Sequence, residues 1–71
     1  MMTAAEFRSI REHIGLLRRE LALALRVSVQ AVQNWDSGRQ KPPGPVEVVM
    51  SAAYEIPAVA ARLRKLARAP E

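Results

Sequence analysis

The sequence of 71 residues contains no cysteine. This absence excludes a disulfide scaffold, a thiolate metal site, an iron–sulfur cluster and a cysteine nucleophile. A chain of this length has room for one small domain, close to the lower size at which an apolar core is stable without such links. We therefore expect residues 1–71 to form a single domain whose stability comes from packing alone.

Aromatic side chains and long apolar runs are also scarce. The only aromatics are Phe7, Trp35 and Tyr54, so the core has to be built from Leu, Val, Ile and Ala, a composition that favours helices over strands. No apolar run is long enough to span a bilayer, and the N-terminal residues lack the basic region and apolar stretch of a secretory signal. We expect a soluble, cytoplasmic protein with no membrane partner.

Residues that carry catalysis or bind metals are few. His13 is the only histidine, Asp36 is the only aspartate, and no serine lies in a nucleophile motif. A metal site needs three or four clustered ligands, and the three isolated glycines do not form a phosphate-binding loop. We expect no enzyme activity, no metal and no cofactor, and we interpret His13 as a surface residue.

What the sequence has in excess is positive charge. Eleven Lys and Arg residues against seven Asp and Glu residues give a net charge of +4, and the isoelectric point is about 10.7. Nine of the eleven cations are Arg, whose planar guanidinium matches phosphate oxygens and guanine edges. The charge predicts an anionic partner, and nucleic acid is the first candidate.

The spacing of apolar residues predicts five helices. Thr3 and Glu6 have the spacing of a capping box at a helix start, Ser28 is a good N-cap, and Leu17 stands where a polar cap is usual. Three prolines within residues 39–45 exclude a helix there and predict an extended loop. The expected helices run from Thr3 to Gly15, Leu17 to Leu25, Ser28 to Gly38, Pro45 to Pro57, and Ala58 to Ala69.

The third predicted helix has an unusual outer face. If its apolar residues point inward, Gln30, Gln33 and Asn34 face outward, with Val29 at the exposed N-terminal end. Amide side chains can form two hydrogen bonds to adenine, and Val can contact a thymine methyl group in the major groove. The pattern favours a helix that contacts DNA bases over an ordinary solvated helix.

Cations lie on both sides of this helix in the sequence. Arg18 and Arg19 precede it, and Arg39 and Lys41 follow it. Phosphates flank a DNA groove on both sides, so these positions are suited to backbone contacts. Uncharged side chains between charged flanks are an arrangement that suits a duplex.

The stretch from residue 18 to residue 39 resembles the Cro/C1-type (XRE) helix-turn-helix family. The resemblance lies in Glu20-Leu21-Ala22 in the second predicted helix, Val27-Ser28 before the third, and a V-x-x-W-[ED]-x-G motif from Val32 to Gly38. It implies an all-α, compact five-helix bundle of the lambda-repressor-like type. Members of the family usually dimerise and repress transcription at palindromic operators.

The resemblance also implies roles for individual residues. The positions that match base contacts are Val29, Gln30, Gln33 and Asn34. The positions that match phosphate contacts are Arg11, Arg18, Ser28, Ser37, Arg39 and Lys41. One departure is Arg26, which stands where the family commonly has Gly and is strained there if its φ is positive.

The fourth and fifth predicted helices carry more apolar surface than one small core absorbs. Residues 45–69 are therefore the expected dimerisation helices. The side chains expected in the interface are Val49, Met50, Ala53, Val59, Leu63 and Leu66.

The expected function is that of a homodimeric repressor that binds double-stranded DNA at a palindromic operator. The chain is also similar to small autorepressors of phage and mobile-element operons, including anti-CRISPR-associated repressors, so its expected location is the bacterial nucleoid or a phage-infected cell. An alternative is an antitoxin or interaction module that neutralises a partner protein, with DNA binding secondary. A third hypothesis, binding of the basic fifth helix to an anionic membrane surface, is disfavoured by that helix's alanine-rich apolar face.

Overall fold

The computed structural model describes residues 2–68, and within this range it consists of five helices without a strand. The helices are α1 (Ala4–His13), α2 (Arg18–Leu25), α3 (Val29–Ser37), α4 (Gly44–Glu55) and α5 (Pro57–Leu66). The expectation of an all-α protein with five helices is confirmed. The last helix ends at Leu66, three residues before the predicted end at Ala69, which lies outside the described residues.

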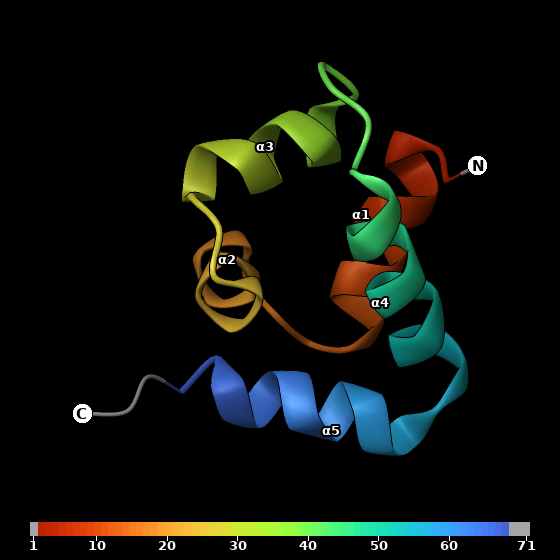
Figure 1. Cartoon of the computed structure of the whole chain (residues 1–71), viewed down its shortest axis with the longest axis vertical. Coiled ribbons are helices and arrows are strands. Elements are labelled where there is room, and N and C mark those ends of the chain that lie inside the picture. The colour runs from red at the N-terminus through yellow and green to blue at the C-terminus, as the bar shows by residue number, and fades with distance from the viewer. Residues whose placement is uncertain (1, 69–71) are drawn as a thin grey trace.

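The five helices form a closed ring in which each helix packs against two others. α1 packs on α3 and α4, α4 on α5, α5 on α2, and α2 on α3. In Figure 1, α3 lies along the top and α5 along the bottom of the molecule, so these two helices are on opposite sides. The molecule measures 31 × 25 × 19 Å, and no helix within residues 2–68 has the length and hydropathy needed to cross a bilayer.

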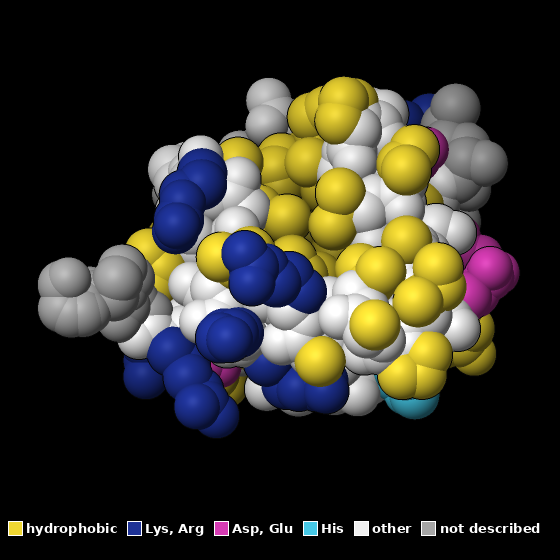
Figure 2. All heavy atoms as spheres, turned by 60° about the horizontal axis from the view of Figure 1, so that its bottom comes forward, with side chains coloured by type: hydrophobic (Ala, Val, Ile, Leu, Met, Phe, Trp, Pro, Cys, Tyr) yellow, Lys and Arg dark blue, Asp and Glu magenta, His cyan; other side chains and the backbone are white. Residues whose placement is uncertain are grey.

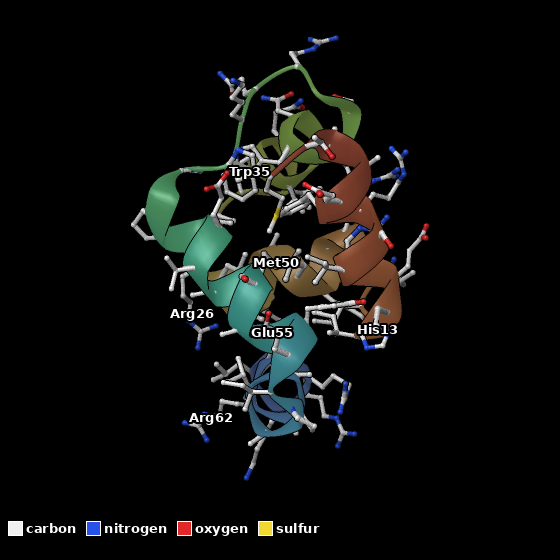
Figure 3. All side chains as sticks on the ribbon, turned by 90° about the vertical axis from the view of Figure 1, so that its right-hand side faces the viewer. His13, Arg26, Trp35, Met50, Glu55 and Arg62 are labelled. Carbon is white, nitrogen blue, oxygen red and sulfur yellow. The ribbon has the colours of Figure 1, made fainter. Side chains whose placement is uncertain are left out.

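The core fills the centre of the ring. Phe7 of α1 and Trp35 of α3 meet edge to face, with ring centroids 5.8 Å apart, and Met50 of α4 is fully buried beside them. Figure 3 views the α1 and α4 side and shows Trp35 and Met50 directed between these helices. Because Trp35 anchors the inner side of α3 in this core, the opposite side of α3 is turned to solvent.

Two predicted helix starts are confirmed. The hydroxyl of Thr3 accepts a hydrogen bond from the backbone N–H of Glu6 at 3.1 Å, and the Glu6 carboxylate accepts one from the N–H of Thr3 at 2.8 Å. Ser28 Oγ accepts from the N–H of Ala31 at 3.0 Å, which begins α3. These local bonds satisfy backbone groups that a helix start leaves unpaired.

The turn between α2 and α3 contains a left-handed residue. Arg26 has φ of 61° and ψ of 43°, a conformation that costs a residue with a Cβ about 1–2 kcal/mol relative to the right-handed region. The N–H of Val27 donates to the carbonyl of Ala22 at 3.0 Å, and this bond closes the end of α2. The strain expected for Arg26 is therefore present, and it is tolerated because the turn is held on both sides by packed helices.

The expected interface residues do not all remain at the surface. Met50, Ala53 and Leu63 belong to the buried core, whereas Val49, Val59 and Leu66 are half-buried. Closing the ring of helices uses the inner faces of α4 and α5 within the protomer itself. We therefore revise the expected dimer surface, because a buried side chain has no surface to offer a second copy.

Candidate nucleic-acid interface

The exposed side of α3 carries all four residues that the sequence assigns to base contacts. Val29, Gln30 and Gln33 are exposed and Asn34 is partly exposed. On the inner side of the helix, Val32 and Trp35 are buried. The apolar anchors and the polar outer face thus fall on opposite sides of one helix, as a 3.6-residue period requires.

Three amide side chains at this surface form a chain of hydrogen bonds. Gln30 Nε2 donates to Asn34 Oδ1 at 3.0 Å, and Asn34 Nδ2 donates to Gln40 Oε1 at 3.1 Å. The backbone N–H of Gln40 also donates to the carbonyl of Asn34 at 3.2 Å. The loop after α3 is therefore bonded to the exposed side of the helix, and it adds Gln40 to the amides displayed there.

Sequence reasoning missed Gln40. Residues 39–45 were predicted as a loop that contributes cations, and the return of this loop onto α3 depends on Gly38, whose φ is 84°. The signal available in the sequence was an amide placed two residues after the helix-terminating glycine. Its contact with Asn34 becomes apparent only once the chain reverses there.

Asp36 is the centre of an ionic network beneath the site. Its carboxylate is 2% exposed and accepts from Arg11 Nε at 3.2 Å and Arg11 Nη2 at 2.9 Å. The same oxygen that accepts from Arg11 Nη2 also accepts from Arg18 Nε at 2.7 Å. Helices α1, α2 and α3 are thereby joined through one carboxylate.

Arg11 lies inside this network. Its side chain is only 8% exposed, and its remaining Nη1 donates to the carbonyl of Leu16 at 3.0 Å. The family resemblance assigns Arg11 to a phosphate contact, but its guanidinium is buried and each of its three nitrogens is already bonded within the protein. We therefore place Arg11 among the residues that support the site rather than among those that touch a ligand.

Arg18 and Arg8 extend from the network to the surface. The Arg18 side chain is 51% exposed, and no hydrogen bond within residues 2–68 engages its two Nη groups. Arg8 Nη1 donates to the backbone carbonyl of Asp36 at 2.9 Å. Arg8 was not predicted as a site residue, because nothing in the sequence indicates that α1 and the end of α3 lie side by side.

One shallow polar hollow beside α3 brings these groups together. It is lined by cations from α1, α2 and the loop after α3, together with the polar face of α3: Arg8, Arg18, Gln30, Gln33, Asn34, Asp36, Ser37 and Arg39. Three guanidinium groups around one hollow, with one buried carboxylate below them, make a site of net positive charge. Such a site is suited to a phosphate group.

The remaining predicted phosphate contacts lie at the two ends of α3. Ser28 is at the N-terminal end, where its hydroxyl is the cap. At the other end, Ser37 Oγ donates to the carbonyl of Asn34 at 3.3 Å and the N–H of Arg39 lies 3.4 Å from Ser37 Oγ. Lys41 is exposed in the following loop. Arg18 and Arg39 line the same hollow near the C-terminal end of α3, so these two cations lie on one side of the exposed amides rather than flanking them as the sequence order suggests.

Comparisons of the chain with protein-family models, with curated proteins and with solved structures found no match.

Proposed function

We propose that this protein binds double-stranded DNA in a sequence-specific manner and acts as a homodimeric transcriptional repressor. In this proposal α2 and α3 form a helix-turn-helix of the Cro/C1 type within a lambda-repressor-like bundle, and α3 enters the major groove. The regulated unit is a small operon of the phage or mobile-element kind in a bacterial cell.

One observation carries the proposal, namely the composition of the exposed side of α3 and its surroundings. On the outer side of α3 lie the neutral amides of Gln30, Gln33 and Asn34, and the cations Arg8, Arg18 and Arg39 converge beside them. Amides distinguish bases by their hydrogen-bond patterns, whereas cations contact phosphates without regard to sequence. A surface that offers neutral amides and cations side by side supports DNA binding better than it supports an acidic protein ligand.

The sequence-specific binding that we propose implies two copies of the protein on the DNA. A single helix contacts only a few base pairs, so a useful operator needs two copies of α3 at half-sites about 34 Å apart, which is one turn of DNA. Within the expected dimerisation segment, three large apolar side chains remain well exposed: Val48 at 68%, Tyr54 at 57% and Ile56 at 49%. In the proposal these side chains replace the buried Met50, Ala53 and Leu63 as the surface offered to a second copy.

A salt series tests the DNA-binding part directly. Fluorescence anisotropy of a labelled duplex of about 40 base pairs should show an affinity that falls steeply with salt, and Arg39→Ala should lower both the affinity and the salt slope, by about one unit for the slope. Arg64→Ala is the matched control, because it removes the same charge from the opposite side of the molecule, where Arg64 Nη1 bonds the carbonyl of Ile14 at 3.2 Å. No binding by the wild-type protein, or equal effects of the two variants, would contradict the proposal.

A further inference from the structure

Helix α5 carries a second cluster of exposed cations. Arg62, Lys65 and Arg68 are exposed, and the segment from residue 57 to residue 68 contains no acidic residue. Ala60 and Leu63 are buried on the inner side of this helix. Helical periodicity then places Ala58, Ala61, Lys65 and Arg68 along the centre of the solvent side, with Arg62 beside them.

The cations of this cluster have no carboxylate partner. No ion pair within residues 2–68 includes Arg62, Lys65 or Arg68, and no hydrogen bond there engages their side chains. Figure 2 views the molecule from the α5 side and shows dark blue atoms gathered over one half of this face, with hydrophobic atoms over the other half. The cluster is thus an unneutralised positive patch, which attracts polyanions.

The patch and the proposed groove-binding face lie on opposite sides of the molecule. α3 is at the top and α5 at the bottom in Figure 1, and Figure 3 shows Arg62 at the end of the molecule far from Trp35 of α3. The molecule is 31 Å across at most, whereas the persistence length of DNA is about 50 nm. A duplex held by α3 therefore does not curl around to reach α5, so an anion on α5 has to come from a second molecule.

We propose that the solvent face of α5, through Arg62, Lys65 and Arg68, binds the phosphate backbone of a second DNA duplex. A protein that holds one duplex with α3 would thereby bridge it to another without regard to the sequence of the second. The inference rests on the proposed function, since it takes the α3 face to be occupied by DNA. It adds a site that is separate from that face in both position and specificity.

The side chains between the cations favour a duplex over a lipid surface. The centre of the face holds Ala58 and Ala61, which have no bulk to insert between lipids, whereas interfacial helices present large apolar side chains to the membrane. Small side chains instead let a phosphate backbone approach the helix closely, so that Lys65 and Arg68 reach its oxygens. Each phosphate neutralised releases counterions, so binding at this face weakens as salt rises.

A two-duplex assay tests the inference with the full chain. One duplex of about 40 base pairs is immobilised, a labelled duplex of unrelated sequence is added, and retention of the label is measured across a salt series. Wild-type protein should retain the labelled duplex. The double variant Lys65→Ala with Arg68→Ala should lower the amount of label retained about fivefold or more. Its affinity for a single duplex should stay within about twofold of the wild-type value. Arg64→Ala is the matched control from the same helix and should retain the label, because its guanidinium bonds Ile14 at the edge of the face.

The outcomes separate the inference from the proposed function. Retention that is unchanged in the double variant would assign bridging to the two α3 faces of a dimer and overturn the inference. Binding of a single duplex without any retention of the second would also overturn it and leave the proposed function in place, whereas no binding of either duplex would remove both. A third result would assign the face to lipid and contradict the inference. In that case the wild-type protein sediments with phosphatidylcholine and phosphatidylserine vesicles, the double variant does not, and no bridging of duplexes is seen.

Discussion

Arg18 Nε donates to Oδ2 of Asp36 at 2.7 Å, which joins the first residue of α2 to the last turn of α3. The bond uses only one nitrogen of the guanidinium and restricts the motion of a side chain that is 51% exposed, while no hydrogen bond within residues 2–68 uses its two Nη groups. A ligand oxygen can then be bound with less loss of side-chain entropy than a freely rotating arginine would suffer. The buried carboxylate of Asp36 thus stabilises the packing of α2 on α3 and also restrains Arg18, the cation at the surface.

Replacing Asp36 should destabilise the fold strongly. Asp36→Ala leaves the buried Arg11 guanidinium without its counter-charge, and breaking a buried ion pair in this way costs about 3–5 kcal/mol. That is comparable to the whole unfolding free energy of a domain of this size, which is of order 5 kcal/mol. Urea denaturation followed by circular dichroism measures the loss, and the expected profile is a large shift or an unfolded variant.

The control for this prediction is Glu12. Its carboxylate lies 3.9 Å from Arg11 Nη2 and its side chain is 65% exposed, so the pair contributes little, about 0–1 kcal/mol. Glu12→Ala should leave the unfolding free energy nearly unchanged. Equal destabilisation by Asp36→Ala and Glu12→Ala would contradict the role given to the buried carboxylate.

Two substitutions of Arg18 separate its charge from its orientation. Arg18→Ala should weaken duplex binding and reduce the salt slope by about one unit, because one phosphate contact is lost. Arg18→Lys keeps the charge but cannot offer the fixed planar guanidinium, so the slope should stay near the wild-type value while the affinity falls. Anisotropy titrations at several salt concentrations measure both quantities, and wild-type affinity in Arg18→Lys would show that orientation by Asp36 is unimportant.

Arg26→Gly should stabilise the protein. Glycine adopts a φ near 61° without the steric cost that Arg26 bears. The expected gain in the free energy of unfolding is about 0.5–1 kcal/mol after the loss of the bond from Arg26 Nη1 to the Leu23 carbonyl.

Gly15→Ala is the opposite experiment. Gly15 has φ of 78° and no atom within 4 Å of an added Cβ, so its substitution should destabilise by about 1 kcal/mol through backbone strain alone. Thermal denaturation measures both shifts, and shifts of the same sign would refute the backbone argument.

The chain of amides makes a prediction about specificity. Asn34→Ala should cost roughly 1–3 kcal/mol on the preferred DNA site and little on random DNA, because base contacts are lost and phosphate contacts remain. Gln40→Ala should show the same pattern with a smaller loss, since Gln40 accepts the hydrogen bond that orients Asn34. Competition between the preferred duplex and random duplexes measures the difference, and equal losses on both would remove these amides from the base-contacting set.

Sequence reasoning succeeded where structure is set locally. The caps at Thr3 and Ser28, and the inward placement of Trp35, follow from spacings of a few residues, and the five helices were predicted on such grounds. The Arg11–Asp36 pair could not be predicted, because the two residues are 25 apart in sequence and meet only when α1 packs on α3. The burial of Met50 has the same origin: an apolar pattern shows which side of a helix is buried, but not whether its own core or a second copy covers it.

The most direct test of the proposed function is selection from a pool of random duplex DNA with purified protein at near-physiological salt, followed by sequencing. A sequence-specific dimer predicts enrichment of a palindrome whose half-sites lie about one helical turn apart, and this enrichment should be lost with Asn34→Ala. A pool that remains random after selection would contradict sequence-specific DNA binding and with it the role assigned to the exposed side of α3.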